Sequence, residues 1–385
     1  MTRPTPERII KDEIRKRGRI TFAEYMEMAL YHPEAGYYIM DREKIGLQGD
    51  FYTSPDVSPL FGKVLADQAE EMWRLSGRPD SWALVEFGAG KGFMARDIIS
   101  QAGERHKDFH SAMSYVIIDK SPYMIKGQKE TLRGVIGPGR GITWLEGLEK
   151  LKPESVVGCF LSNELIDAFP VHRVIKKDGE YREIYVTCEG GSIAEEAGVP
   201  SSSDLIEYIN DFGIEMEDEQ AIEINLAVRD WLEGVSRALC RGFILTIDYG
   251  DTAGRLFSPM RHRGTIRSYR RHRLADSLYD CPGDQDITAS VNFTALMRWG
   301  EEVGLMTAGY ASQSHFLMNL GILNYLKPQE QGAGFDHAAL RETMAVKKLI
   351  MPEGMGSVFK VLAQQKGFEG GVNLSGFSGR FGSRR

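Results

Sequence analysis

Short apolar segments alternate with amphipathic segments through the middle of the chain, and this alternation constrains the fold more than any other feature. The apolar segments are 83–87, 114–118, 156–161 and 242–247. The amphipathic segments, with apolar residues at helical spacing, lie near 93–103, 122–133 and 221–240. Strands that alternate with helices usually pair in parallel, because each helix returns the chain to the same end of the sheet. The pattern therefore predicts an α/β fold with a doubly wound, mostly parallel sheet.

The flanking sequence predicts how the rest of the chain is divided. Residues 1–80 are predicted to form a mainly helical N-terminal part that includes an aromatic loop. The sheet then occupies 81–365, interrupted by inserted cap segments at about 171–220 and 251–290. The last segment, 366–385, is rich in glycine, serine and arginine and has no hydrophobic period, so we expect a mobile tail.

Composition excludes several classes of protein. The chain has 385 residues, 42% hydrophobic and 26% charged, which is typical of a globular protein. Its net charge of −7 argues against a protein that coats nucleic acid. The four cysteines are widely spaced, so neither a metal site nor a disulfide framework is indicated. The charged N-terminus and the lack of a long apolar run predict a cytoplasmic protein without membrane insertion, and leave a homodimer open.

A glycine-rich segment follows the first predicted core strand. It reads Glu86-Phe-Gly-Ala-Gly-Lys-Gly92, so that Gly88, Ala89, Gly90 and Gly92 leave room for a ligand against the backbone. The dinucleotide motif would need a small residue where this chain has Phe93. The order instead resembles the S-adenosylmethionine loop of Rossmann-like methyltransferases, in which an acid after the next strand binds the ribose. Asp119 occupies that position.

A second polar cluster follows the third predicted strand. Asn163, Glu164 and Asp167 are expected at the carboxyl edge of the sheet, where open α/β sheets bind ligands. If the segment is helical, Glu164 and Asp167 share one face and could hold a guanidinium, an ammonium or a metal. The alternative is an N-cap followed by acids that the helix dipole stabilises.

Together with two aromatic motifs and two later ones, these segments resemble the MidA-type family of S-adenosylmethionine-dependent methyltransferases. The motifs are Tyr31-His-Pro…Gly36-Tyr-Tyr38, Gly49-Asp-Phe-Tyr-Thr-Ser-Pro-Asp56, 86–92, Asn163–His172, Asp248-Tyr-Gly250 and Asp286–Phe293. The resemblance covers about residues 7–365. Mitochondrial members of this family are complex I assembly factors that methylate an arginine of a complex I subunit.

The resemblance implies a Rossmann-like class I methyltransferase sheet with S-adenosyl-L-methionine as cofactor. Besides the 86–92 loop and Asp119, it implies that a loop carrying Asp50, Thr53 and Ser54 covers the cofactor. It also implies that Asn163, Glu164 and Asp167 line the methyl-transfer site, and that the acceptor is an arginine of a partner protein, such as a respiratory complex I subunit. Two alternatives remain: an RNA or small-molecule N/O-methyltransferase, and a non-catalytic assembly chaperone with a vestigial cofactor pocket.

Seven arginines and no acid lie between Arg255 and Arg273. Such a cluster could bind RNA. Because charge runs are usually solvated or paired, we favour pairing with the acidic segment 195–219.

Overall fold

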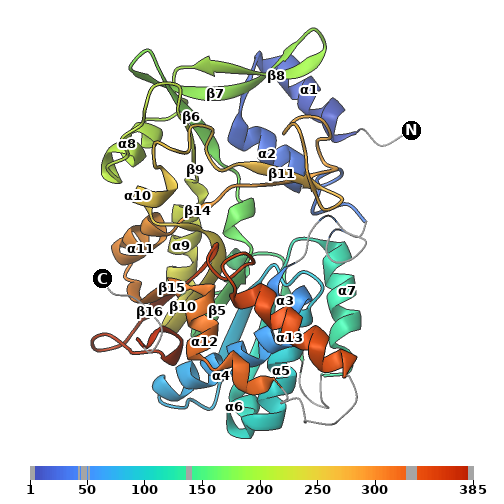
Figure 1. Ribbon diagram of the computed structural model, residues 1–385, viewed down its shortest axis with the longest axis vertical. Coiled ribbons are helices and arrows are strands. Elements are labelled where there is room, and N and C mark those ends of the chain that lie inside the picture. Colours follow the sequence, from blue (N-terminus) through green and yellow to red (C-terminus); the bar gives the residue numbers. More distant parts are fainter. Residues whose placement is uncertain are drawn as a thin grey trace. The chain divides into compact units, whose positions relative to one another are not determined.

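The main sheet contains the parallel strands that the apolar segments predict (Figure 1). The computed structural model describes residues 5–41, 44, 50, 53–135, 141–326 and 336–379. The strand order is β15 (Met306–Ser312), β16 (Phe359–Lys366), β10 (Leu239–Asp251), β5 (Val156–Asn163), β2 (Trp82–Phe87), β3 (Met113–Ile118) and β4 (Ile142–Leu145). From β10 to β4 every neighbouring pair is parallel, and β16 runs antiparallel to β10 and β15. The predicted α/β fold class is confirmed.

The chain divides into two compact units, each built from three segments. Unit 1 comprises Met1–Phe51, Ile166–Trp231 and Gly250–Arg298, and unit 2 comprises Tyr52–Leu165, Leu232–Tyr249 and Trp299–Arg385. The division differs from the expected one. The inserted segments belong to the same unit as the N-terminal helices, whereas residues 52–80 belong to the unit with the main sheet.

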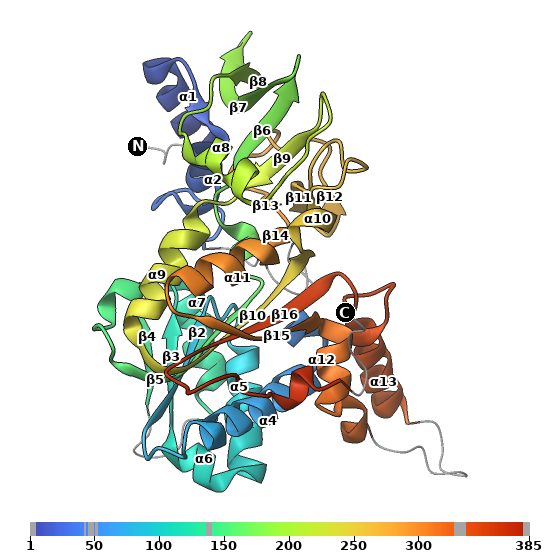
Figure 2. The same ribbon diagram turned by 90° about the vertical axis from the view of Figure 1, so that its left-hand side faces the viewer.

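Several helices of unit 2 begin at a serine, threonine or aspartate capping residue. The helices of this unit are α3 (Ser54–Val57), α4 (Pro59–Leu75), α5 (Phe93–Arg105), α6 (Lys107–Ala112), α7 (Pro122–Leu132), α12 (Gln313–Asn319) and α13 (His337–Ile350). At the start of α4 the Ser58 side chain accepts a hydrogen bond from the Leu60 N–H, and Pro59 occupies the first turn. Helices α4 and α5 pack side by side (Figure 2). The core of this unit includes the fully buried rings of Trp82, Phe109 and Phe243.

Unit 1 combines helices with two antiparallel sheets. Its helices are α1 (Pro6–Arg17), α2 (Phe22–Tyr31), α8 (Asp204–Asp211) and α10 (Ala253–Leu256). One sheet has the order β1 (Ile20–Thr21), β7 (Glu180–Glu189), β6 (His172–Lys177) and β9 (Ala221–Ile224), and β8 (Ser192–Gly198) pairs with β7. The other has the order β12 (Arg273–Leu274), β11 (Arg267–Arg270) and β13 (Asp286–Thr288). The core of this unit includes Ile10, Phe22, Tyr25 and Ile287.

Helices α9 (Ala227–Ala238) and α11 (Phe293–Glu302) each contain a unit boundary. Strand β14 (Val291–Asn292) belongs to unit 1 and pairs with the last two residues of β10. No helix among the described residues is long and apolar enough to cross a membrane.

The expected mobile tail is wrong for residues 366–379. The Ser375 N–H and hydroxyl donate to the Glu71 carboxylate of α4, at 2.9 and 2.6 Å. The Leu374 side chain is only 2% exposed, and the Phe377 ring contacts Phe316 of α12 with centroids 5.2 Å apart. A few well-placed apolar groups dock this segment although it has no hydrophobic period. Residues 380–385 lie outside the described part of the chain.

The expected pairing of the arginine cluster with residues 195–219 is also wrong for the described residues. Within the cluster, Arg255 pairs with Asp251 at 3.8 Å and Arg270 with Asp284 at 2.5 Å. The acids of 195–219 that form ion pairs do so with arginines elsewhere in the chain, namely Glu195 with Arg173, Glu196 with Arg19 and Asp211 with Arg298.

Candidate active site

The glycine loop of unit 2 connects β2 to α5 through three left-handed residues. Gly88, Gly90 and Gly92 have φ of +58°, +51° and +79°. Side chains with a Cβ rarely adopt this conformation, so glycine is required for the turn. The Gly88 N–H donates to the Ile118 carbonyl of β3 at 2.9 Å, and a Cβ on Gly88 would lie 3.3 Å from Leu165. The loop therefore presents bare backbone beside the segment that follows β5.

Asp119 lies directly after β3 and is tied to the glycine loop by Gln128 of α7. The Gln128 amide donates to Asp119 at 2.7 Å and to the Gly90 carbonyl at 3.1 Å, while its oxygen accepts from the Trp144 indole at 3.0 Å. Gln128 is fully buried. Sequence analysis missed this residue, although a glutamine on the inward face of a predicted amphipathic helix was the available signal.

Glu86 is a buried acid on β2, 1% exposed, and the Tyr115 hydroxyl donates to its carboxylate at 2.6 Å. Burial raises the pKa of Glu86 to about 7; the Tyr115 hydrogen bond acts in the opposite direction, and the negative charge of Asp119 adds to the rise. A neighbouring cation would favour the ionised form and reverse much of this shift.

Asn163 and Glu164 lie where β5 ends, beside Ile247 of β10. Glu164 is a non-glycine residue with φ of +52°, and its N–H donates to the Ile247 carbonyl at 2.9 Å. Its carboxylate Oε1 accepts from the Ser54 N–H at 3.0 Å and from the Asn163 amide at 3.1 Å. Such strained conformations cost about 1–3 kcal/mol and cluster at functional sites.

The helix considered for 163–167 does not form. After the left-handed Glu164, the Leu165 N–H donates to the Asp248 carboxylate of β10 at 3.2 Å, so the chain is held to the sheet edge. Only a short 3-10 turn follows, at Ile166–Ala168. Glu164 and Asp167 therefore do not share a helix face, and they belong to different units.

The aromatic motif and two of the predicted site acids lie in unit 1. Asp167 is 5% exposed, and its charge adds to burial in raising the pKa of Tyr31 well above its usual range. The Tyr38 hydroxyl donates to Asp286 at 2.7 Å, and burial raises the pKa of Asp286 to about 6. Asp50 accepts from the Tyr37 hydroxyl at 2.8 Å and from the Arg271 N–H at 2.6 Å.

Thr53 and Ser54 begin α3 in unit 2. Thr53 forms a capping box with Asp56. The buried Ser54 hydroxyl donates to the Gln313 side chain at 3.4 Å, and the Ser54 N–H donates to Glu164. Residues 51 and 52 of the same predicted loop lie outside the described residues.

The residues of unit 2 fit a charged nucleotide-like ligand such as S-adenosylmethionine. The three glycines leave a space beside the backbone that side chains would fill. Glu86 lies near the end of β2, and Asp119 directly follows the neighbouring parallel strand β3. Asn163 is 8% exposed, and its Oδ1 has no hydrogen-bond partner among the described residues. This oxygen can therefore accept a hydrogen bond from a bound ligand. No cluster of three or more potential metal ligands occurs in the described ranges.

Curated proteins similar to this chain include two mitochondrial enzymes. The Drosophila melanogaster "Protein arginine methyltransferase NDUFAF7 homolog, mitochondrial" is 28% identical over 93% of this chain and 84% of its own length. The Homo sapiens protein arginine methyltransferase NDUFAF7, mitochondrial, is 27% identical over 91% and 81%. These names contradict the cytoplasmic assignment, which is therefore wrong. It rested on the charge of the N-terminal residues and the lack of a long apolar run, and neither property determines a compartment.

Solved structures and a family model agree on the class of enzyme. A Burkholderia thailandensis protein described as a "COG1565 superfamily member and likely methyl transferase", solved with bound S-adenosyl-homocysteine, has 31% identity and a TM-score of 0.86, covering 97% of this chain and 94% of the other. A second structure from the same organism has 30% identity and a TM-score of 0.82. Residues 64–311 match the family described as "Putative S-adenosyl-L-methionine-dependent methyltransferase". This chain therefore belongs to that family, and it is an S-adenosyl-L-methionine-dependent methyltransferase.

Proposed function

We propose that the enzyme methylates an arginine of a partner protein. The observation that carries this proposal is the pair of acceptors at the end of β5: the Glu164 carboxylate and the Asn163 Oδ1, which has no partner within the described chain. A guanidinium has five N–H donors and no acceptor, so it needs such a surface. The similar animal proteins are named protein arginine methyltransferases, which supports the same substrate class.

The family resemblance supplies the roles of the other predicted residues in this proposal. It assigns Glu86, Gly88, Ala89, Gly90, Gly92 and Asp119 to cofactor binding, Asp50, Thr53 and Ser54 to the segment that covers the cofactor, and Asp167 to the methyl-transfer site. The bound cofactor supplies a methyl group on a positively charged sulfur. Glu164 orients the guanidinium, offsets the charge that develops on the attacking nitrogen, and accepts the proton which that nitrogen loses. The family resemblance extends the proposal to an acceptor like a respiratory complex I subunit.

Labelling a lysate with radioactive S-adenosylmethionine tests the acceptor class. We expect a labelled protein that protease destroys and nuclease does not, and acid hydrolysis should release methylarginine. A nuclease-sensitive product would instead favour the RNA alternative. The absence of any labelled acceptor would favour a non-catalytic chaperone.

Replacing Glu164 tests its role. We expect Glu164→Gln, and to a comparable degree Asp167→Asn, to lower turnover roughly 30- to 1000-fold, because a charge-assisted contact at a desolvated site contributes about 2–4 kcal/mol. Calorimetry should show unchanged affinity for S-adenosylhomocysteine. Glu149→Gln, at an exposed acid of the same unit, is the matched control. Near-normal turnover of Glu164→Gln would assign this carboxylate a structural role.

A further inference from the structure

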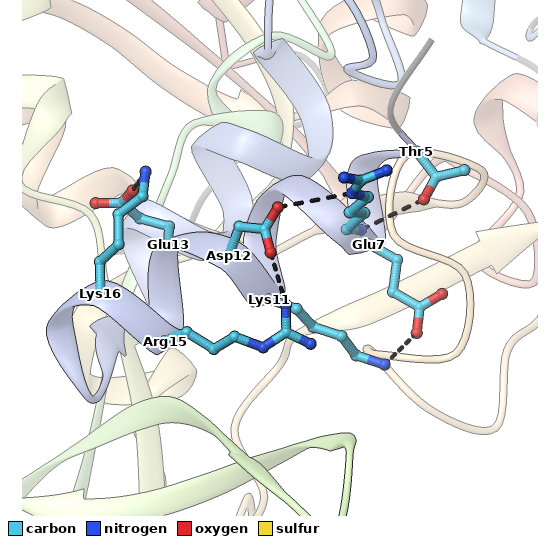
Figure 3. A network of polar contacts seen from close by, with 8 residues as sticks. Thr5, Glu7, Lys11, Asp12, Glu13, Arg15 and Lys16 are labelled. Atoms are coloured by element: carbon cyan, nitrogen blue, oxygen red, sulfur yellow. Dashed lines mark hydrogen bonds and ion pairs between the residues drawn. The ribbon is translucent and has the colours of Figure 1, made fainter. Parts of the chain in front are cut away.

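Part of the arginine cluster in unit 1 carries charge that the described chain does not balance. Five of its arginines are exposed and make no ion pair with any described residue: Arg261, Arg263, Arg267, Arg271 and Arg273. Helix α1 shows the opposite arrangement, in which Arg15 pairs with Asp12 at 2.6 Å and Lys11 with Glu7 at 2.6 Å (Figure 3). The cluster therefore carries more unbalanced positive charge than α1 does.

Three of these arginines lie on one hairpin, residues 267–274, which we call the arginine hairpin. Strands β11 and β12 lie side by side (Figure 2). They pair Arg270 with Arg273, so Arg271 and His272 form a two-residue turn. Both have positive φ, +51° and +60°. Hairpin turns of this type strongly prefer Asn-Gly, because larger side chains are strained there.

Asp50 holds this strained turn in place. Its carboxylate accepts the Arg271 N–H at 2.6 Å, and its carbonyl accepts the His272 N–H at 3.0 Å. The Tyr37 hydroxyl donates to the same carboxylate at 2.8 Å, and Tyr37 is fully buried. The exposed side chains of Arg271 and Arg273 are thus displayed from a rigid tip, which lowers the entropy lost on binding.

Apolar side chains are exposed beside these charges. Leu274 is 60% exposed at the end of the hairpin, and Met260 is 91% exposed in the loop that precedes it. Arginine and methionine are enriched where proteins bind proteins. Tyr269, the aromatic residue of the hairpin, is half-buried, so its ring is less accessible for stacking on bases than an exposed ring would be. The net charge of −7 repels a long polyanion such as RNA, because a long chain extends over much of the protein surface. A short acidic segment contacts only the hairpin, where the local charge is positive.

We propose that the arginine hairpin docks an acidic, partly apolar segment of the acceptor protein. This inference rests on the proposed function for the identity of the partner. The guanidinium groups of Arg267, Arg271 and Arg273 would bind carboxylates, and Leu274 would contact an apolar side chain between them. Docking at the hairpin would bind the acceptor protein, and the hairpin arginines would take no part in the methyl transfer itself.

Fluorescence anisotropy with two probes tests the docking chemistry without requiring turnover. The probes are a labelled twelve-residue peptide of glutamate and leucine and an oligouridine of equal charge. The test variant is Arg267→Gln/Arg271→Gln/Arg273→Gln. The control, Arg8→Gln/Arg15→Gln/Arg17→Gln, removes the same charge from α1, where each arginine has an acidic partner.

We expect the hairpin variant to bind the peptide about tenfold more weakly at low salt, because each exposed charge pair contributes a few-fold in affinity. The control should match the wild type, and high salt should remove the difference. Equal peptide affinity in the two variants, or tighter binding of oligouridine that the hairpin variant loses, would overturn the proposal.

Turnover separates this inference from the proposed function. On the acceptor found by labelling, the hairpin variant should raise KM about tenfold with kcat unchanged, since the interaction is the same in the ground and transition states. Affinity for S-adenosylhomocysteine should not change. If labelling finds no protein acceptor, the proposed function fails, and the peptide comparison still decides whether the hairpin binds acidic chains.

Discussion

At the scale of single residues, Glu86 and Glu164 illustrate two costs that this fold accepts near the candidate site. Glu86 is a carboxyl group removed from water, and Glu164 is a bulky residue in a left-handed conformation. Neither arrangement is favourable by itself. Both are held by neighbours, Tyr115 for the first and Ser54, Asn163 and Ile247 for the second. Such costs are typical of sites that bind ligands or perform chemistry.

The raised pKa of Glu86 predicts a pH-dependent stability. Because its folded pKa, about 7, exceeds the ordinary value of 4.5, the folded state binds more protons between these limits, and stability falls as pH rises through that window. Glu86→Gln removes this ionisation. We expect the variant, without ligand, to be about 2–3 kcal/mol more stable than the wild type at pH 8, on the order of 1.4 kcal/mol per pKa unit.

Urea unfolding at pH 4.5 and pH 8 measures this difference. At the lower pH both proteins carry a neutral side chain in the folded state, so their stabilities should nearly coincide. Glu154→Gln, at an exposed position, is the control. A difference that is the same at both pH values would show that ionisation of Glu86 is not its cause.

At the scale of elements, the C-terminal segment shows how little apolar surface is needed to dock a polar stretch. Its contacts to α4 and α12 come from Leu374, Ser375, Gly376 and Phe377. They combine one fully buried leucine, one aromatic contact and hydrogen bonds to Gln68 and Glu71. This segment extends the chain beyond the last strand of the sheet and covers part of the core of unit 2.

We expect Leu374→Ala to lower the free energy of unfolding by about 2–4 kcal/mol, because it leaves a cavity in a packed site. Deleting residues 367–385 should have at least this effect. Met344→Ala removes a side chain that is 60% exposed, and should change stability by less than about 0.5 kcal/mol. Thermal unfolding of the three variants provides the comparison. A deletion that leaves the melting temperature unchanged would contradict the docked arrangement.

At the scale of the whole molecule, we expect ligands of the correct cofactor class, and no others, to stabilise the folded chain against unfolding. A ligand that binds only the folded chain adds about 2.7 kcal/mol at a hundred times its Kd. We expect S-adenosylhomocysteine to give this gain and NAD to give none, because Phe93 stands where dinucleotide folds need a small residue. Calorimetric unfolding with each ligand measures the effect. Stabilisation by NAD would contradict the assignment of the glycine loop.

Local patterns in the sequence were enough to predict the sheet, the glycine loop and the position of Asp119. Alternating apolar and amphipathic segments restrict the chain to a parallel sheet, and glycines at 88, 90 and 92 mark a turn whose φ values other residues avoid. The family resemblance added the cofactor. These features depend on residues close together in the chain, so the sequence alone was sufficient.

Contacts between distant residues decided the rest. Gln128 joins Gly90 to Asp119, and Asp50 holds the turn at Arg271. The segment around Leu374 packs on α4 and α12, which both lie much earlier in the sequence. The left-handed Glu164 opposes its own backbone preference and is stabilised by Ile247 and Ser54. Local propensity cannot predict such features, because the stabilising free energy comes from partners that only the folded chain brings together.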